Sequence, residues 1–283
     1  MLIDTHTHVN MKAFELDENQ VLLNALEKNI WLVNVGTKYE TSKKAVEIAE
    51  RYDEGVYAAL AIHPIHLHDD IEEFDIIDGK EYKFTTKKQE FDYEKFKELA
   101  LSSSKVVAIG ETGLDVYRMS DDKKEEVLKV QEDVFRQSIR LAKELDLAVI
   151  VHGRGQADNP TAIYDRIIEI LEEEKPARVV AHCFGGTLEQ GVKLAQMGYY
   201  VGITGIVTFK NAKMVADLAR WLPLENIVIE TDAPYLAPDP YRGKRNEPSY
   251  VEFVARKIAE IRGVDYEKVA YETTVNARRL FII

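Results

Sequence analysis

Short apolar segments alternate with longer segments in which apolar residues recur every three to four positions, along most of the chain. Several short segments are unbroken apolar runs, which is typical of parallel strands covered on both faces. The longer segments have the period of amphipathic helices. We therefore expect strands at Leu2–Thr5, Trp31–Val35, Val56–Ile62, Val106–Ile109, Ala148–Val151, Val179–Ala181, Tyr199–Ile203 and Ile227–Glu230.

Helical patterns occupy most of the intervals between these strands. They cover residues 18–29, 40–52, 92–103, 122–145, 160–174, 187–197 and 211–221. A further helix is expected to start near Pro248, because proline suits the first helical turn, and another to span 265–280. This alternation predicts the α/β class, with a (β/α)8 TIM barrel formed by residues 1–283 as one domain.

Residues 63–92 interrupt the alternation. The segment is rich in Asp, Glu and Lys and has little periodicity. We interpret residues 65–92 as an acidic insertion after the third strand, which forms a small hairpin or a lid. His66 and His68 lie in this insertion and away from a strand end, so we expect both to be solvated loop residues.

Polar residues that follow the strands carry the candidate chemistry. His6 and His8 are two residues apart on an extended chain, so both imidazoles point the same way and can reach one cation. A lone pair of this kind, or a lone histidine at a strand end, is more often structural. In a barrel, however, the carboxyl ends of all strands converge on one face, where active sites lie. Ligand-type residues end the later strands at Glu111, His152, His182 and Asp232.

The four histidines and two carboxylates, Glu111 and Asp232, would form a mixed nitrogen and oxygen site. Such a site suits zinc, manganese or a related divalent ion. Six ligands exceed the need of one tetrahedral zinc, and a carboxylate shared between two ions would explain the surplus. Two ions a few Å apart suit phosphoryl displacement, because they stabilise the attacking and leaving oxygens together. We predict two divalent metal ions, with Zn, Mn, Mg, Co and Ni as candidates.

Charge and cysteine content narrow the function further. The 283 residues carry a formal charge of −12, from 37 basic and 49 acidic side chains, which repels nucleic acid unless the charge is locally reversed. One cysteine, Cys183, excludes an internal disulfide and fits a reducing compartment. No secretory signal is visible in the sequence, and no apolar stretch approaches the ~18 residues of a membrane span. We expect a cytoplasmic protein with no membrane segment; its oligomeric state is not indicated.

Basic residues gather in the proline-rich loop Ala233–Glu247, which is expected to be stiff and non-helical. It carries Arg242, Lys244 and Arg245. Since arginine can hold a phosphate through two donors, we predict that Arg242 and Arg245 bind substrate phosphate. The alternative is that one of them pairs with Glu247 or another carboxylate and anchors the loop.

Other residues near the predicted strand ends are candidates for substrate contact. Arg154, two residues after His152, is a second phosphate-binding candidate. His63 ends the third strand, and we predict that it contacts phosphate and is not a metal ligand. Tyr117 and Phe184 could stack on a base, and a core role suits each of them equally well.

Beyond these single residues, the chain resembles the TatD-related metal-dependent hydrolases of the amidohydrolase superfamily. The matching segments keep the family's order over nearly the whole chain. They are Asp4–His8, Ile62–Pro64, Ala108–Asp115, Val149–Arg154, His182–Gly186, Glu230–Leu236 and Arg242–Pro248.

The resemblance implies a (β/α)8 barrel with a site for two divalent ions. It implies that one ion is held by His6, His8, Glu111 and Asp232. A bridging Glu111, with His152 and His182, would hold the other. Many superfamily relatives bridge their ions with a carbamylated lysine on the fourth strand, and Glu111 at that place favours the TatD branch.

The resemblance also implies deoxyribonuclease activity, including trimming of single-stranded DNA from the 3′ end. The ions would lower the pKa of a water molecule, and Asp232 is the candidate to orient and deprotonate it, beside the bridging Glu111. One alternative is a hydrolase of small esters, lactones or cyclic amides, since the same fold and metals serve those reactions. Another is a non-catalytic barrel whose metals are structural.

Overall fold

Parallel strands form a barrel in the computed structural model, which describes residues 1–69 and 71–283. Within these residues, one eight-stranded sheet has the order β1-β2-β3-β6-β7-β8-β9-β10. Its strands are β1 (Leu2–Thr7), β2 (Ile30–Val35), β3 (Val56–Leu60), β6 (Val106–Asp115), β7 (Ala148–Arg154), β8 (Val179–Ala181), β9 (Tyr200–Ile203) and β10 (Ile227–Ile229).

The first and last strands meet and nearly close the barrel. The amide of Asp232 donates to the carbonyl of His6 at 2.8 Å, and the amide of His8 donates to the carbonyl of Ala233 at 2.7 Å. The predicted (β/α)8 barrel is therefore confirmed. The closing hydrogen bonds involve candidate ligand residues themselves, so closure of the barrel also sets their relative positions.

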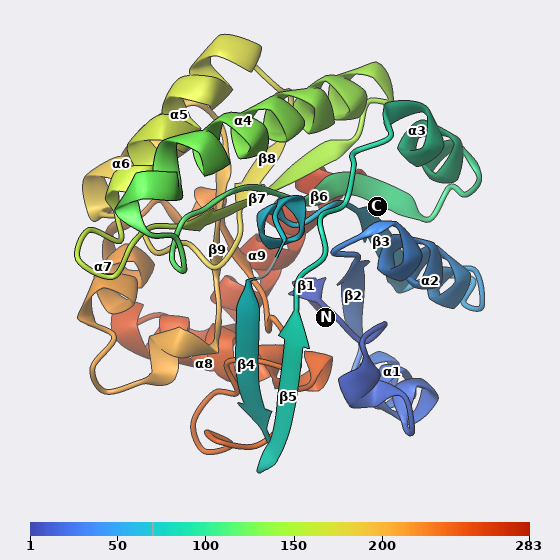
Figure 1. The fold of residues 1–283 in the computed structure, drawn as a ribbon. Helices are drawn as coiled ribbons and strands as arrows, with labels where there is room; N and C mark the ends of the chain where they lie inside the picture. Colours follow the sequence, from blue (N-terminus) through green and yellow to red (C-terminus); the bar gives the residue numbers. More distant parts are fainter. Residues whose placement is uncertain (70) are drawn as a thin grey trace.

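Helices surround the barrel (Figure 1). They are α1 (Glu18–Glu27), α2 (Tyr39–Ala49), α3 (Tyr93–Leu101), α4 (Asp121–Glu144), α5 (Ala162–Glu174), α6 (Leu188–Gln196), α7 (Lys213–Trp221), α8 (Val251–Arg262) and α9 (Tyr266–Phe281). The helix expected near Pro248 begins with the short turn η5 (Pro248–Tyr250), and η1 (Lys12–Phe14), η3 (Gly205–Thr208) and η4 (Leu224–Asn226) are further 3-10 turns. Within residues 1–69 and 71–283, no helix combines the length and apolar character that crossing a membrane requires.

Three strands extend further than their apolar pattern predicts. β1 continues to Thr7, β6 to Asp115 and β7 to Arg154, so that the polar motifs lie on strand backbone and not in loops. The apolar pattern ends where the side chains reach the open end of the barrel, but the backbone ladder continues, as in the pairing of Asp115 with Arg154. Strand geometry therefore holds several of the functional side chains.

The barrel interior is filled and is closed at its amino-terminal end. Val33 and Ile150 from the strands pack with Phe281 from α9 in one buried apolar cluster. Thr274 of α9 also donates a hydrogen bond to the carbonyl of Met1 at 3.1 Å, beside the start of β1. The carboxyl-terminal end is thus the end available for a site, as is general for this fold.

The insertion after β3 forms the expected hairpin. It begins with η2 (Pro64–Leu67) and continues as the antiparallel strands β4 (Glu72–Ile77) and β5 (Lys80–Thr85). Asp78 and Gly79 connect them with φ values of 50° and 75°, as a two-residue hairpin turn requires. Figure 1 shows this hairpin in front of the barrel strands.

The expectation that His66 and His68 are solvated is wrong, because both are half-buried. The His66 ring lies 6.0 Å from that of Phe84 on β5. Burial lowers the pKa of His66 to about 3. The insertion thus packs on its own first turn and shields these rings from water.

Candidate metal centre

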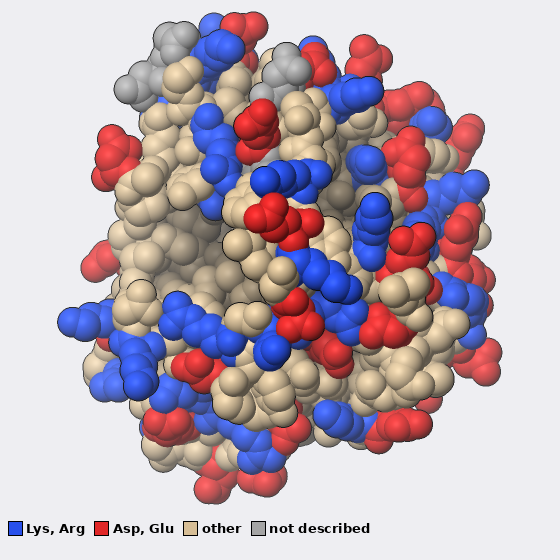
Figure 2. Space-filling view, turned by 60° about the horizontal axis from the view of Figure 1, so that its bottom comes forward, with Lys and Arg blue, Asp and Glu red and all other residues tan. Residues whose placement is uncertain are grey.

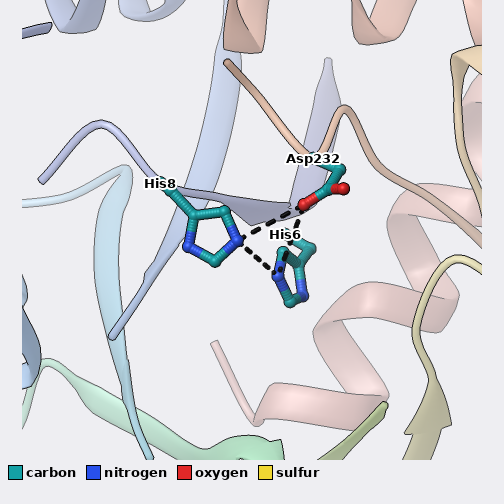
Figure 3. A group of neighbouring side chains, drawn as sticks. All are labelled: His6, His8 and Asp232. Atoms are coloured by element: carbon teal, nitrogen blue, oxygen red, sulfur yellow. Dashed lines mark hydrogen bonds and ion pairs between the residues drawn. The ribbon is translucent and has the colours of Figure 1, made fainter. Parts of the chain in front are cut away.

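His6 and His8 present their rings to the open end of the barrel from the end of β1. Their Nε2 atoms lie 3.1 Å apart. Asp232, after β10, brings Oδ1 to 3.3 Å from Nε2 of His8 and 3.8 Å from Nε2 of His6. Figure 3 shows these three side chains converging from two chain segments. One donor atom from each lies within 4.8 Å of the others, which is an arrangement suited to a shared cation.

Glu111 reaches the same region because of a bulge in β6. Gly110 pairs with Ile150 and Thr112 pairs with Val151 on β7, so Glu111 is an extra residue between them. A bulge of this kind redirects a side chain. Gly110 has φ 148°, and a Cβ atom there would lie 2.4 Å from the carbonyl oxygen of Ile150, so glycine is required beside Glu111.

The Glu111 carboxylate is buried and stands between two groups of histidines. Its Oε2 lies 3.4 Å from Nε2 of His6 and 3.8 Å from Nε2 of His8. Its Oε1 lies 2.6 Å from Nδ1 of His152 and 3.8 Å from Nε2 of His182. One carboxylate oxygen therefore faces each group, which fits the bridging role that the resemblance implies.

His182 connects the two groups. Its ring stacks on that of His6, with centroids 3.4 Å apart, and its Nε2 lies 3.7 Å from Oδ1 of Asp232. With these contacts, the structure brings together all six predicted metal ligands: His6, His8, Glu111, His152, His182 and Asp232. Imidazole nitrogens and carboxylate oxygens in this mixture suit a divalent transition metal.

Two of the histidines are oriented through their second ring nitrogen. Nδ1 of His8 lies 2.9 Å from the carbonyl oxygen of Val35, and Nε2 of His152 lies 3.1 Å from Oδ2 of Asp115. Asp115 is itself held by Gln131, whose Oε1 accepts from its amide at 2.9 Å. Histidines that bind metals commonly donate the other N–H to a carbonyl or a carboxylate, which sets the ring orientation.

Glu230 contacts the second ring nitrogen of His182 as an ion pair. Its Oε1 lies 2.9 Å from Nδ1 of His182, and the side chain is fully buried. The same carboxylate accepts hydrogen bonds from the amide of Cys183 and from Oγ1 of Thr5. Sequence reasoning missed Asp115 and Glu230 as site residues. Their position at the ends of β6 and β10, beside predicted ligands, is the signal that could have identified them.

His63, which the sequence predicts to contact phosphate and not a metal ion, lies against the predicted ligands. Its Nε2 is 3.3 Å from both Oε1 of Glu111 and Nδ1 of His152, and these residues form a second group with ligand atoms within 4.8 Å. Its Nδ1 accepts a hydrogen bond from the amide of Ile65 at 3.2 Å, so Nε2 faces the cluster. Nε2 of His63 can therefore donate a hydrogen bond to this group. Its contact with phosphate remains a prediction.

Charge in the cluster is balanced between carboxylates and imidazoles. Burial raises the pKa of Glu111, but the imidazoles of His63, His182 and His6 outweigh it and hold that pKa well below its usual range. Burial lowers the pKa of His152, but hydrogen bonds to Asp115 and Glu111 prevail and raise it to about 9. A divalent ion would take the place of protons on such imidazoles.

Arg154 lies at the end of β7, exposed and two residues beyond His152. Its Cζ lies 3.8 Å from the centre of the Tyr117 ring, a cation–π contact. Tyr117 is 39% exposed, so the stacked pair is accessible to a ligand. Phe184, in contrast, is buried against Tyr164 with ring centroids 4.6 Å apart, and takes the core role.

The two arginines of the loop after β10 have different surroundings. Arg242 is exposed, and its Cζ lies 4.3 Å from the centre of the Phe209 ring. Arg245 donates to both carboxylate oxygens of Asp17, at 2.9 and 2.6 Å, and to Glu247 at 3.2 Å. Arg245 thus takes the loop-anchoring alternative, and its predicted phosphate contact is untested. Arg242 is exposed and can face a ligand.

Comparison with known proteins agrees with this site. The family model described as TatD related DNase matches residues 3–282. A Bacillus subtilis (strain 168) protein, the uncharacterized metal-dependent hydrolase YabD, is 39% identical over 286 residues that cover 100% of both chains. An Escherichia coli (strain K12) protein, the uncharacterized metal-dependent hydrolase YcfH, is 34% identical and covers 100% of this chain and 96% of its own.

The fold is also similar to a crystal structure of YJJV, a TatD homolog from Escherichia coli K12. The TM-score is 0.81 at 28% sequence identity, over 100% of this chain and 98% of the other. Family match, close relatives and shared architecture lead to one assignment: the chain belongs to the TatD family of metal-dependent hydrolases.

Proposed function

We propose that this protein is a deoxyribonuclease that hydrolyses phosphodiester bonds with two divalent ions and trims single-stranded DNA from the 3′ end. The position of Glu111, with one carboxylate oxygen toward each histidine group, carries the proposal. Ions on both sides of one carboxylate would be close enough to act on one phosphate. The family description, TatD related DNase, supports DNA as the substrate class.

In this proposal His6, His8 and Asp232 would hold one ion, His152 and His182 would hold the other, and Glu111 would be shared between the two groups. When bound, the ions polarise the phosphoryl oxygen and lower the pKa of water.

Asp232 is suited to accept the proton of the attacking water. Burial raises the pKa of Asp232, but the cation of His182 and the hydrogen bond from His8 outweigh it and lower that pKa below its usual range. The carboxylate is therefore ionised at neutral pH, as a base must be. Its side chain is 15% exposed, so it can be reached from the open end of the barrel.

Arg154 and Arg242 are the residues proposed to position phosphate groups. Both are exposed, and each guanidinium lies against one aromatic ring, Tyr117 or Phe209, which limits its freedom. Figure 2 shows a hollow on one face of the molecule, with Lys and Arg side chains at its rim and Asp and Glu side chains also nearby. Such a rim would reverse the net charge of −12 locally, where a nucleic acid approaches.

A hydrolase of a small ester, lactone or cyclic amide is the second candidate, because a net charge of −12 disfavours a polyanionic substrate. The two are separated by assaying the metal-loaded protein on 3′- and 5′-labelled single- and double-stranded DNA, with a panel of esters and lactones in parallel. Release of mononucleotides from the 3′ end supports the proposal. Turnover of esters or lactones with no cleavage of DNA contradicts it and favours the second candidate.

A further inference from the structure

The tip of the β4–β5 hairpin lines a cavity that is open to solvent and contains none of the predicted metal ligands. Its volume is about 300 Å³, at the small end of the range of ligand pockets. The hairpin contributes Ile77, Lys80 and Tyr82, and the segment after β10 contributes Tyr241, Lys244 and Tyr250. The cavity is therefore formed by two segments that leave the barrel at different strands.

The sheet order places this cavity beside the metal centre. The hairpin follows β3, and the segment it meets follows β10. Because β1 and β2 lie between β3 and β10 in the barrel, the hairpin must pass in front of the ends of β1 and β2 to reach that segment. β1 carries His6, and His8 follows directly. The ring of Tyr235 lies 6.5 Å from that of His8, and Asn246, within the cavity-forming segment, donates to the carbonyl of Tyr235 at 2.7 Å. One chain segment thus touches both places.

The hairpin presents a distinct face to the cavity. Lys80 lies opposite Ile77 in the strand pairing, and Tyr82 is two residues further along β5, so these three side chains share one face. Ile77 is 6% exposed, whereas its neighbour Ile76 on the other face is 62% exposed. Lys83 also belongs to the other face, where its ammonium lies over the Phe74 ring at 5.0 Å.

Aromatic rings and cations are combined around the cavity, together with the carboxylates of Asp78 and Glu247. Tyr241 stacks on Tyr250 with ring centroids 4.3 Å apart, and Tyr241 remains 37% exposed. Lys244 pairs with Asp78 at 3.3 Å, but side-chain exposures of 70% and 54% make this a weak, screened pair. Within the part of the chain that the structure describes, Lys80 has no carboxylate at ion-pair distance, although its charge is near enough to Asp17 to help lower the pKa of that carboxyl. Rings that can stack on bases, next to cations, are typical of sites for single-stranded nucleic acid.

We propose that this cavity is a subsite for one nucleotide of a single-stranded DNA substrate whose scissile phosphate lies at the metal centre. The proposal rests on the deoxyribonuclease function proposed above. Tyr82 and Tyr241 supply ring faces for a base, and Lys80 and Lys244 supply charge for a phosphate. Single strands are the occupant because a duplex hides its base faces from such rings. The hairpin thereby favours strands long enough to span from the metal centre to its tip.

A matched pair of lysine variants tests the subsite. Lys80→Ala and Lys83→Ala each remove one charge from β5, on the cavity face and on the opposite face respectively. The measurement is kcat/KM on a 12-nucleotide single strand and on bis(p-nitrophenyl) phosphate, over a range of salt concentrations. K80A should lower kcat/KM on the strand several-fold and make its dependence on log salt shallower by about 0.7. K83A should change kcat/KM on the strand by no more than about twofold from wild type. Both variants should change kcat/KM on the small diester by no more than about twofold.

Tyr82→Ala and Tyr82→Phe give an independent measure. Loss of the ring should lower kcat/KM on the strand by at least about fivefold, and phenylalanine should restore it, because stacking needs only the ring. If wild type cleaves DNA, two outcomes overturn the subsite. One is an equal loss of kcat/KM on the strand in K80A and K83A, and the other is an equal loss in Y82A on the strand and on the small diester. A wild-type protein that hydrolyses the small diester but no strand overturns the proposed function itself.

Discussion

Asp115 lies 3.1 Å from Nε2 of His152, and this contact leaves Nδ1 of the ring as the nitrogen that faces the other ligands. Because an ionised carboxylate only accepts hydrogen bonds, Nε2 carries a proton in this contact, and Nδ1 is the nitrogen left for a metal ion. The orientation of one predicted metal ligand is thus set by a residue on the neighbouring strand.

Asp115→Asn should weaken metal binding and activity without unfolding the protein. The amide can no longer accept through a charged oxygen, and changes of this kind typically cost about 10- to 100-fold in metal affinity or activity. Metal titration and kcat at saturating metal would measure the loss. Asp133→Asn, on the exposed surface of α4, is the matched control. Wild-type affinity and turnover in D115N would contradict the orienting role.

Asp232→Asn should reduce turnover by about 10²- to 10⁴-fold, the usual contribution of a general base. The measurement is kcat at saturating metal, because Asp232 is also a ligand and the variant needs a higher metal concentration. Far-ultraviolet circular dichroism should stay unchanged, since the side chain lies beyond the end of β10. Turnover within a few-fold of wild type would contradict the role of Asp232 as proton acceptor.

Metal binding should release protons and strengthen as pH rises. Burial lowers the pKa of His182, but the charges of Glu230, Glu111 and Asp232 outweigh it and raise the pKa to about 10. The metal-free imidazole is thus protonated at pH 7, and a metal ion must displace that proton. Calorimetric titration in two buffers of different ionisation enthalpy measures the release. Identical heats in both buffers would contradict the proton release. Full activity after chelation would contradict the requirement for a metal ion.

Arg242→Ala should weaken cleavage of single-stranded DNA and reduce its dependence on salt. Removal of one phosphate contact lowers the slope against log salt by about 0.7 for single strands. The loop keeps the hydrogen bond from the amide of Asp239 to Oγ1 of Thr208 at 2.9 Å, which does not involve Arg242. Rates on an oligonucleotide between 50 and 200 mM NaCl, which is roughly the range where such slopes are measured, provide the test. An unchanged slope would assign Arg242 a structural role.

Arg245→Ala should act on stability. The hydrogen bonds of the guanidinium hold the pKa of Asp17 below its usual range, so the ion pair stabilises the fold above the ordinary carboxyl pKa, and this contribution is lost as pH falls through the lowered value. Asp17 is 42% exposed, and solvent screening limits the effect to about 0.5–1 kcal/mol. Tm should therefore drop at pH 7, and the difference from wild type should shrink near pH 3. A constant difference at both pH values would contradict this account.

Local sequence patterns determined the architecture and the ligand types. Unbroken apolar runs and helical periods depend only on residues that are near in sequence, so the strands and helices can be recognised without the fold. The spacing of His6 and His8 likewise places two imidazoles on one side of β1. The convergence of strand ends then follows from the barrel as a class.

Tertiary structure decided which neighbours each of these residues meets. The bulge that directs Glu111 between the histidine groups depends on the register of β6 with β7. The choice of Arg245 between phosphate and carboxylate depends on Asp17, 228 positions away in sequence. Such contacts are set by long-range pairing and by competition among charged side chains, which carry no local period. The sequence by itself therefore determined the barrel and the kinds of ligand at its open end, and the folded chain alone decided how they are oriented and which cations stay free.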